Sequence, residues 1–146
     1  MITIRSAELN DVDIIAPLFD AYRMFYNQQS SLNDAMEFLK QRLIKNESVI
    51  FLAFYENKAV GFTQLYPLFS SVSLKKLWLL NDLFVDEGYR KSGAATALLE
   101  QAKAYAQSTG AKGLLLETSN DNLPAQNLYE KNGWVKEENF FYEFTF

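Results

Sequence analysis

A basic turn followed by small residues is the first feature of the sequence that suggests chemistry. It lies between an apolar run and an Ala-rich segment, in the order Arg90-Lys91-Ser92-Gly93-Ala94-Ala95. The pattern predicts a strand that passes through the turn into a helix. The first turn of a helix presents unpaired backbone N–H groups and the positive end of the helix dipole, so an anion can bind there when no side chain blocks it. Two cations beside such a turn favour a diphosphate ligand, although the same small residues would also allow close packing of the helix on a sheet.

A polar loop and a short helix near the end of the chain form the second candidate segment. Asn122 or Asp121 is placed to cap the helix, and the small Ala125 lies on the same helix face as Asn122 and Tyr129. Tyr129 could therefore aim its hydroxyl along the open edge of a sheet. The alternative is an aromatic residue that packs in the core with one hydrogen bond. Trp134 is expected to be a core residue.

The composition excludes several kinds of catalysis. The 146 residues include no Cys and no His, which excludes a disulfide framework, a thiolate nucleophile, a His-dependent triad and an ordinary zinc site. No metal cofactor is expected. Proton transfers in an enzyme of this composition must use carboxylates, Tyr, Lys, backbone groups, water or the substrate itself.

The charge balance bears on the partners. The chain carries 18 acidic and 14 basic residues, a formal net charge of −4, which disfavours a nucleic-acid partner and is compatible with a cationic substrate. The longest apolar run, Val49–Phe54, is far shorter than the ~20 residues of a membrane-spanning helix. The opening residues also lack a signal-peptide core. We therefore expect a soluble, cytoplasmic protein with no membrane partner.

The elements that must position these residues are expected in the order of one α/β domain over residues 1–146. Alternation of apolar and polar residues predicts strands, and a 3.6-residue period predicts helices. Strands are expected at 2–5, 49–55, 59–68, 74–85, 113–117, 134–136 and 140–146, and helices at 10–25, 31–43, 93–108 and 123–131. The resulting order, β-α-α-β-β-β-α-β-α-β-β, predicts a central mixed sheet flanked by helices.

Taken together, the two candidate segments resemble the GNAT superfamily of N-acetyltransferases. The first is similar to its R/Q-x-x-G-x-G/A acetyl-CoA motif. The second is similar to its N-x-x-A…Y…G-[FW] segment, through Asn122, Ala125, Tyr129, Gly133 and Trp134. The order of elements is similar as well, so the resemblance covers essentially the whole chain. It implies a GNAT-type fold, with a mixed and mostly antiparallel sheet, and acetyl-CoA as co-substrate.

The resemblance also implies roles for individual residues. The strand that includes Asn81–Val85 would splay from the strand at 113–117 and leave a cleft for acetyl-CoA. The residues implied to bind it are Leu83, Phe84, Val85, Arg90, Lys91, Ser92, Gly93, Ala94, Ala95 and Asn122. Tyr129 would lie near the thioester sulfur as the general acid for the departing thiolate, and a backbone N–H near Leu83 would stabilise the oxyanion.

Direct attack of an amine on a thioester needs no nucleophile from the enzyme, in keeping with the missing Cys and His. We expect Asp82 to receive the proton of the amine, directly or through a water, or to hold its positive charge. A carboxylate on a solvated strand face is the alternative. The segment Leu80–Val85 looks most like the small polyamine and histone-tail acetyltransferases. Members with a described carboxylate base often carry an acidic residue where this chain has Asn81.

The acceptor must be bound by other segments. We expect Tyr22, Tyr26 and Tyr66 to line its site, because aromatic rings suit a cationic amine, although Tyr22 and Tyr66 would fit a core equally well. The expected reaction is acetyl transfer to a primary amine of a small molecule, polyamine-like or an amino acid, or to a lysine side chain. The alternative from another class is a non-catalytic acyl-CoA-binding sensor or scaffold. Residues 140–146 alternate apolar side chains that could pair across a homodimer, and core packing would also explain them.

Overall fold

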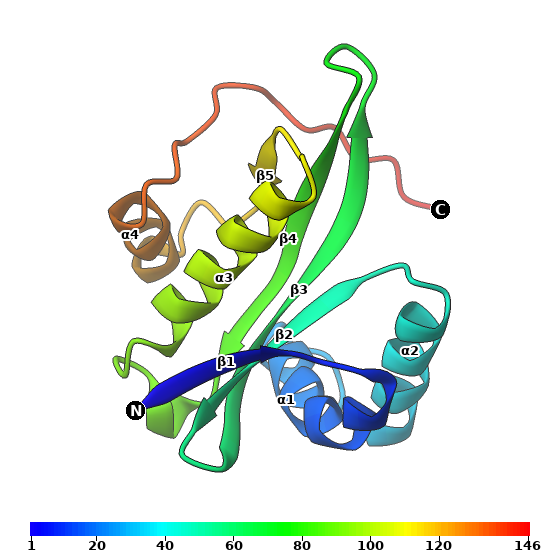
Figure 1. Ribbon diagram of the computed structural model, residues 1–146, viewed down its shortest axis with the longest axis vertical. Helices are drawn as coiled ribbons and strands as arrows, with labels where there is room; N and C mark the ends of the chain where they lie inside the picture. Colours follow the sequence, from blue (N-terminus) through cyan, green and yellow to red (C-terminus); the bar gives the residue numbers. More distant parts are fainter.

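Five strands form one open sheet in the computed structural model, which describes residues 1–146. The strands are β1 (Ile2–Ser6), β2 (Val49–Tyr55), β3 (Lys58–Ser70), β4 (Lys75–Val85) and β5 (Gly113–Leu115). The helices are α1 (Val12–Phe25), α2 (Leu32–Ile44), α3 (Ala94–Ser108) and α4 (Leu123–Lys131), with the short 3-10 helices η1 (Leu9–Asp11) and η2 (Glu87–Tyr89). The strands lie in the order β1-β2-β3-β4-β5. All neighbours are antiparallel except the parallel pair β4 and β5, so the expected mixed, mostly antiparallel sheet flanked by helices is confirmed (Figure 1).

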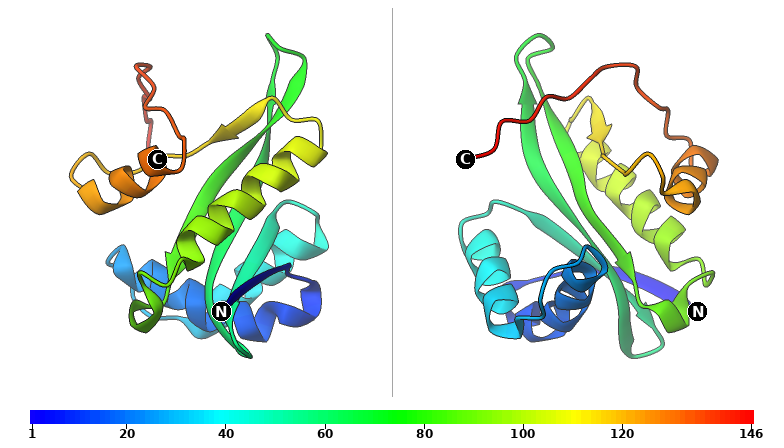
Figure 2. Two further views of the ribbon diagram at one scale, coloured as in Figure 1. Left: turned by 60° about the vertical axis from the view of Figure 1, so that its left-hand side comes forward. Right: turned by 180° about the vertical axis from the view of Figure 1, so that it is seen from behind.

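Helices cover both faces of the sheet. Apolar residues recur every three or four positions in the helices, so each helix buries one stripe of its surface. Phe19 of α1 and Leu39 of α2 pack with Phe62 of β3 on one face, whereas Leu98 of α3 packs with Leu65 of β3 on the other. Figure 2 shows α3 on its own face of the sheet, opposite α1 and α2. None of the helices combines the length and the apolar character needed to cross a lipid bilayer.

A β-bulge at Asn81 divides β4 into two halves. Gln64 of β3 lies opposite Asp82, and the next residue of β3 lies opposite Leu80, so Asn81 has no partner. Side chains of a regular strand alternate between the two faces, and one extra residue reverses that alternation. Leu80 and Leu83 therefore both pack toward α3. Asp82 and the residue that follows Leu83 face the helices α1 and α2.

The two parallel strands, β4 and the edge strand β5, stay together over a short distance. β4 and β5 pair through Leu77, Trp78 and Leu79 of β4 alone. β4 continues to Val85 while β5 ends at Leu115. The lower half of β4, beyond the bulge, thus has β3 as its neighbour on one side and no strand on the other. The splayed arrangement that the family resemblance implied is present.

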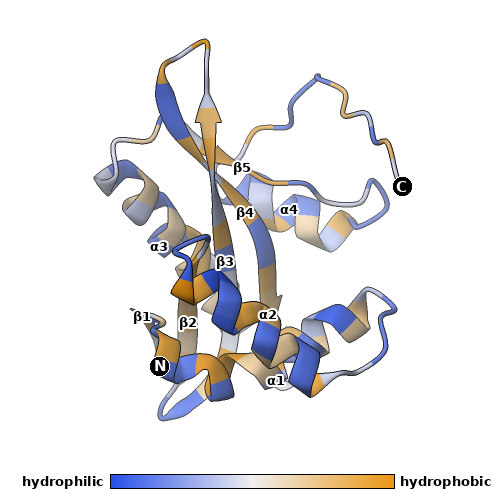
Figure 3. Cartoon of the chain, turned by 90° about the vertical axis from the view of Figure 1, so that its right-hand side faces the viewer, coloured by the Kyte–Doolittle hydropathy of each residue, from blue (hydrophilic) through white to orange (hydrophobic).

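Residues 134–146 contain no regular secondary structure, so the strands expected at 134–136 and 140–146 are wrong. A strand needs a neighbour to satisfy its backbone groups, and the sheet ends at β5. The alternation of side chains describes an extended chain correctly, but it does not supply the partner. Five aromatic side chains of this segment are exposed: Phe140, Phe141, Tyr142, Phe144 and Phe146. Figure 3 shows the segment leaving α4 and standing clear of the sheet.

Candidate active site

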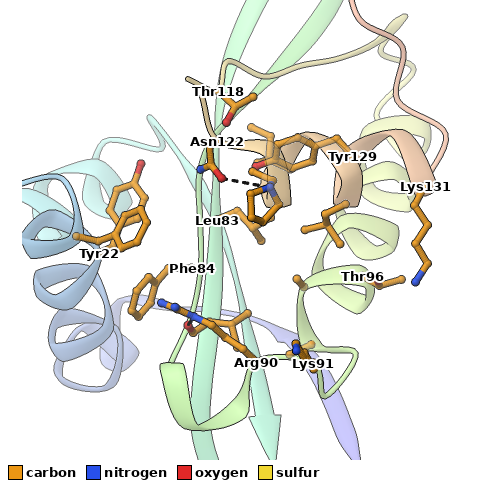
Figure 4. Close-up of a pocket in the computed structure, with 18 of the residues that line it drawn as sticks. Tyr22, Leu83, Phe84, Arg90, Lys91, Thr96, Thr118, Asn122, Tyr129 and Lys131 are labelled. Carbon is orange, nitrogen blue, oxygen red and sulfur yellow. Dashed lines mark hydrogen bonds between the residues drawn. The ribbon is translucent and has the colours of Figure 1, made fainter. Parts of the chain in front are cut away.

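A cleft of about 720 Å³ opens where β5 ends beside β4. Its volume lies within the range of about 300–1,000 Å³ that is usual for small-molecule sites. Residues of α1, β4, the turn before α3, the first turn of α3 and α4 line it. Figure 4 shows side chains from these elements facing the same space, with Tyr22 of α1 and Tyr129 of α4 on either side of β4.

The turn before α3 forms a cradle of backbone N–H groups at the cleft. Lys91 and Gly93 have left-handed backbone conformations, with φ of 63° and 89°. A Cβ at Gly93 would meet no atom within 4 Å, so the position is open but its conformation favours glycine. The amide of Ala94 donates to Ser92 Oγ over 3.3 Å. The amides of Ala95 and Thr96 have no acceptor within the helix, which leaves them available to an anion.

The charges at the cleft favour an anionic ligand. Four charged residues line it: the cations Arg90, Lys91 and Lys131, and the anion Glu117. This basic excess contrasts with the net charge of −4 of the whole chain. Arg90 and Lys91 are exposed beside the positive end of α3. The geometry of the turn and its charge thus both suit a diphosphate.

The lower half of β4 offers an unpaired backbone edge to the cleft. The carbonyl of Asp82 accepts from Thr63 Oγ1 of β3, so it points away from the cleft. The carbonyl of Val85 points the opposite way and accepts from Arg90 Nε over 3.2 Å. Successive residues of a strand direct their backbone groups to opposite edges. Leu83 follows Asp82 by one residue and precedes Val85 by two, so its backbone shares the direction of Val85 and presents its N–H and C=O toward the cleft.

Helix α4 brings Asn122 and Tyr129 to the other wall of the cleft. Asn122 caps the helix, because its Oδ1 accepts from the amide of Ala125 over 3.2 Å. The two N–H groups of the Asn122 side chain remain available to a ligand. Burial raises the pKa of Tyr129 to about 12. The hydroxyl is therefore protonated at neutral pH, as a proton donor must be.

Aromatic residues of α1 form the third wall, opposite α4. Tyr22, Phe25 and Tyr26 line the cleft. The rings of Tyr22 and Tyr26 meet edge to face at 5.1 Å. The Tyr22 hydroxyl donates to the carbonyl oxygen of Asn81 over 3.2 Å, which fixes the ring against the bulge of β4. Burial raises the pKa of Tyr22, and the nearby Asp82 raises it further. A cation could bind against these ring faces.

Asp82 lies behind β4 and does not line the cleft. It is 2% exposed, and its carboxylate accepts from Asn81 Nδ2 over 2.7 Å and from Gln64 Nε2 over 2.5 Å. Burial raises the pKa of Asp82, and hydrogen bonds from Asn81, Gln64 and Tyr22 offset part of that rise. Gln64 Oε1 is buried without a partner. The cleft reaches this carboxylate through Asn81 and Tyr22, which line it.

The structure gathers most of the residues singled out from the sequence. Nine of the ten residues expected to bind acetyl-CoA line the cleft, and so do Tyr129, Tyr22 and Tyr26. Ser92, Asp82 and Tyr66 do not line it. Ser92 instead accepts from the amide of Ala94, and Tyr66 is half-buried, with a pKa raised by burial. The bulge explains why Asp82 lies outside the cleft. The extra residue turns the side chain of Asn81, and not that of Asp82, toward the cleft.

Several residues of the cleft were not expected. They include Phe25, Asn81, Thr96, Thr118 and Lys131. The spacing of Tyr22, Phe25 and Tyr26 on one helix face could have revealed Phe25, since positions three and four apart are neighbours. Nothing in the sequence marks Thr118, which lies in the loop before α4.

A helix N-terminus with free amides beside two splayed parallel strands is the arrangement expected from the family resemblance, and comparison with known proteins agrees on the family. Residues 15–134 match the acetyltransferase (GNAT) family. The chain belongs to this family, and it is an N-acetyltransferase.

Individual relatives cover nearly the whole chain. An N-acetyltransferase of Bacillus subtilis named YhfO, itself described as uncharacterized, is 50% identical and aligns with 94% of this chain and 92% of its own length. A probable acetyltransferase of Haemophilus influenzae is 37% identical over 84% of this chain and 81% of its own. The crystal structure of a probable acetyltransferase, 40% identical, superimposes with a TM-score of 0.92 and covers 98% of both chains.

Proposed function

We propose that the protein transfers an acetyl group from acetyl-CoA directly to a primary amine of a small cationic molecule, polyamine-like or an amino acid, or to a lysine side chain. The observation that carries the proposal is one continuous cleft that joins an anion cradle, a free strand edge and an aromatic wall. The first two features suit the two ends of a CoA thioester, and the third suits an amine. A site of this kind brings both substrates together, so no covalent enzyme intermediate is needed.

The cofactor is held chiefly by backbone groups. The amides of Lys91 to Ala95 bind the diphosphate, with charge from Arg90 and Lys91 beside them. The edge of β4 at Leu83 to Val85 hydrogen-bonds the pantetheine arm, and the free side-chain N–H groups of Asn122 donate to it from the opposite wall. The N–H of Leu83 stabilises the oxygen on which negative charge develops.

Tyr129 provides the proton for the departing thiolate. Its hydroxyl lies in the cleft, and its pKa of about 12 keeps it protonated at neutral pH. A new C–N bond forms while the C–S bond breaks, and the electron pair of that bond stays on sulfur. Proton transfer from Tyr129 then neutralises the thiolate, and solvent restores the hydroxyl.

Asp82 receives the proton of the amine through Tyr22. The carboxylate is buried behind β4, so an acceptor in the cleft cannot touch it. The Tyr22 hydroxyl lines the cleft and neighbours Asp82. Rotation of the hydroxyl hydrogen turns its donation from the Asn81 carbonyl to the carboxylate, which leaves the Tyr22 oxygen free to accept from the amine. The raised pKa of Asp82 makes it a better proton acceptor than an ordinary carboxylate.

The aromatic wall supports a cationic acceptor but does not determine which amine it is. Tyr22, Phe25 and Tyr26 present ring faces and edges, and the negative groups Asp82, beside Tyr22, and Glu117, in the cleft, suit a cation. More distant relatives are named for different acceptors, since one from Bacillus subtilis is streptothricin acetyltransferase A and one from Sulfurisphaera tokodaii is an N-alpha-acetyltransferase. The likeness of Leu80–Val85 to polyamine and histone-tail enzymes favours amines with a second positive charge.

A thiol-reactive dye offers a direct test, because the chain has no Cys and all thiol signal comes from released CoA. Polyamines, amino acids and lysine peptides would be tested as acceptors with acetyl-CoA in excess. We expect turnover with at least one cationic amine. Tyr129→Phe should then lower kcat by about 10²- to 10⁴-fold, the usual contribution of a general acid, and keep the Kd for acetyl-CoA within about twofold.

Tyr105→Phe serves as the matched control, since Tyr105 packs between Phe51 and Trp78 away from the cleft. It should leave kcat unchanged. Unchanged turnover in Tyr129→Phe would remove Tyr129 from the role of acid. Tight binding of acetyl-CoA with no CoA released by any amine would instead support the acyl-CoA sensor.

A further inference from the structure

Gln64 of β3 is a buried polar residue whose presence packing does not explain. It is 0% exposed. Its Nε2 donates to Asp82 Oδ2 over 2.5 Å, and its Oε1 is buried without a partner. An unpaired buried acceptor destabilises the fold, and an apolar side chain such as Met would fill a similar volume without that cost. The amide is therefore better explained by its contact with Asp82.

The pairing of β3 with β4 brings Gln64 and Asp82 together. The two residues lie directly opposite each other, and the register shifts at the next step of β3, between Gln64 and Leu65. Side chains of opposite residues lie on the same face of a sheet. Both therefore lie on the face that carries α1 and α2, where Phe62 packs with Phe19. The contact is thus built into the strand pairing at the bulge.

Gln64 differs from the other groups that hold the carboxylate of Asp82, because water cannot replace it. Asn81 Nδ2 donates to Oδ1 over 2.7 Å, and the Tyr22 hydroxyl stands beside the carboxylate. Both of these residues line the cleft, so water there can take over their bonds. Gln64 is fully buried and does not line the cleft. It is the donor to this carboxylate that solvent does not reach.

No cation compensates the charge of Asp82, since none of the salt bridges of the protein involves it. The titratable and charged groups that face it are Tyr22 of α1, Tyr66 of β3 and, acting on Tyr66, Arg42 of α2. Burial raises the pKa of both tyrosines, so they are uncharged. Arg42 is engaged by Glu47 at 3.0 Å. The charged form of Asp82 thus depends on hydrogen bonds from neutral donors.

We propose that Gln64 is a positioning residue for the proton transfer, whose amide keeps Asp82 charged and holds the carboxylate toward the Tyr22 hydroxyl. Asn81 and Gln64 bond one carboxylate oxygen each, from two different strands, so the plane of the group is fixed. The proton of the amine then passes through Tyr22 to a carboxylate that is already oriented. Gln64 itself lies outside the cleft. The inference rests on the role of Asp82 in the proposed function.

Two substitutions remove the donor and keep the approximate shape of the side chain. Gln64→Met leaves Asp82 Oδ2 without a partner, and Gln64→Glu places a second carboxyl group beside it. Thr63→Val is the matched control, because it removes a buried hydrogen bond of 2.8 Å to the backbone carbonyl of Asp82 and leaves the carboxylate contacts in place. The control separates the loss of any buried hydrogen bond in β3 from the loss of this one.

The first measurement is the pKa of Asp82, followed by NMR of its carboxyl carbon in the absence of substrates and assigned with Asp82→Asn. Burial raises this pKa, and the hydrogen bond from Gln64 offsets part of the rise. Loss of that bond should raise the pKa further, by about one to two pH units in Gln64→Met. The rise should be larger in Gln64→Glu, where two carboxyl groups share a proton. Thr63→Val should leave the pKa unchanged.

The second measurement is the pH dependence of kcat/KM with an amine that the CoA-release assay identifies. The ratio of variant to wild type is used, since titration of the amine cancels in it. For Gln64→Met we expect a ratio about 10- to 100-fold below one at acid pH, which is the pKa shift expressed as a rate. The ratio should rise toward one at high pH, where Asp82 is charged in both proteins. A role in packing alone would lower the ratio by the same factor at every pH.

Thermal unfolding provides a readout that needs no activity. A carboxyl group with a raised pKa in the folded state favours folding when protonated, and this contribution is lost as pH rises through that pKa. Because Gln64→Met raises the pKa of Asp82 further, its Tm should be closest to that of wild type at acid pH and fall increasingly below it as pH rises. The Tm difference should not depend on pH when both proteins also carry Asp82→Asn.

An unchanged pKa of Asp82 in Gln64→Met would overturn the proposal, and so would a Tm difference from wild type that is the same at every pH. A raised pKa with a rate ratio that does not depend on pH would overturn the role of Asp82 as proton acceptor, and the proposal with it. If no amine releases CoA, the proposed function fails, whereas the NMR titration still tests whether Gln64 holds the charge of Asp82.

Discussion

The two sides of the cleft are built in different ways. The side assigned to acetyl-CoA consists chiefly of backbone groups from one continuous stretch, the lower half of β4 and the turn into α3, with Asn122 and Tyr129 added from α4. The side assigned to the acceptor consists of side chains from α1 and β4, which lie up to 59 residues apart, as in the bond from Tyr22 to Asn81. The backbone geometry of the cofactor side depends on a few residues that allow an unusual conformation, such as Gly93. The side chains of the acceptor side can be replaced one at a time without changing the backbone.

This difference implies that the two sides respond to different substitutions. The cofactor side should be sensitive to changes of backbone conformation and tolerant of changes of side chain. The acceptor side should show the reverse. A family that keeps one co-substrate and varies the amine would be expected to use such a division.

The largest expected effect is that of Asp82→Asn, which keeps shape and removes the charge. Gln64 Oε1 has no partner, so Gln64 can turn its amide over and accept from the introduced side chain. We expect kcat/KM to fall by about 10²- to 10⁴-fold through loss of the proton acceptor, with the Kd for acetyl-CoA unchanged. Rates measured over a range of acceptor concentrations check kcat/KM, and calorimetry checks the Kd for acetyl-CoA. A matching loss of acetyl-CoA affinity would show that the two sides are not separate.

The same variant makes a stability prediction whose sign follows from the raised pKa of Asp82. A carboxyl group with a raised pKa in the folded state favours folding when protonated, and this contribution is lost as pH rises through that pKa. Asp82→Asn should therefore match the Tm of wild type at acid pH and exceed it at pH 8. The activity of wild type should fall as pH drops through the same pKa. A Tm lower than wild type at pH 8 would contradict a buried, destabilising charge.

A smaller effect is expected from Tyr22→Phe, which removes the proposed proton path and keeps the ring. We expect kcat/KM to fall by about 10- to 100-fold, less than for Asp82→Asn, because a water can take the place of the hydroxyl. Tyr66→Phe is the control, since Tyr66 lies outside the cleft, and should stay within about twofold. Equal losses in the two variants would assign the effect to packing rather than to the hydroxyl.

The smallest expected effect tests the backbone side. Gly93→Ala places a Cβ on a residue with φ of 89°, which costs about 1–2 kcal/mol. Relaxation of that strain should distort the cradle and weaken acetyl-CoA binding by about tenfold. Gly110→Ala imposes similar strain at φ of 74° beyond the far end of α3. It should lower Tm comparably and leave the Kd within about twofold, and an equal rise of Kd in both would refute a local role.

The sequence predicts the cofactor side of the cleft better than the acceptor side, because the residues of the cofactor side are contiguous in the chain and those of the acceptor side are not. Arg90 to Ala95 are contiguous, so a local pattern defines the turn, the helix start and the charge. Tyr22 and Tyr66 look alike in sequence, yet only Tyr22 reaches the cleft. Their difference depends on how far α1 and β3 extend past the cleft, which no local pattern records.

Two further features depend on longer-range contacts that the sequence does not record. Asp82 was expected as the proton acceptor, and that role stays a prediction; the bulge at Asn81 reverses the alternation and turns the carboxylate behind the strand rather than into the cleft. A bulge arises from pairing with β3 and leaves no clear mark in β4 itself. The final strands were expected from the alternation at 140–146, whereas a strand forms only where a free edge is within reach.

The bulge also determines how β4 tolerates changes of chain length. Because side chains alternate with a period of two, deletion of Asn81 would turn one half of the strand over relative to the other. Trp78 and Leu80 would leave the α3 core, and Leu77 and Leu79 would replace them. Replacement at 81, by contrast, changes one side chain that faces the cleft. Variation at this position should therefore occur by exchange of the residue and not by its loss.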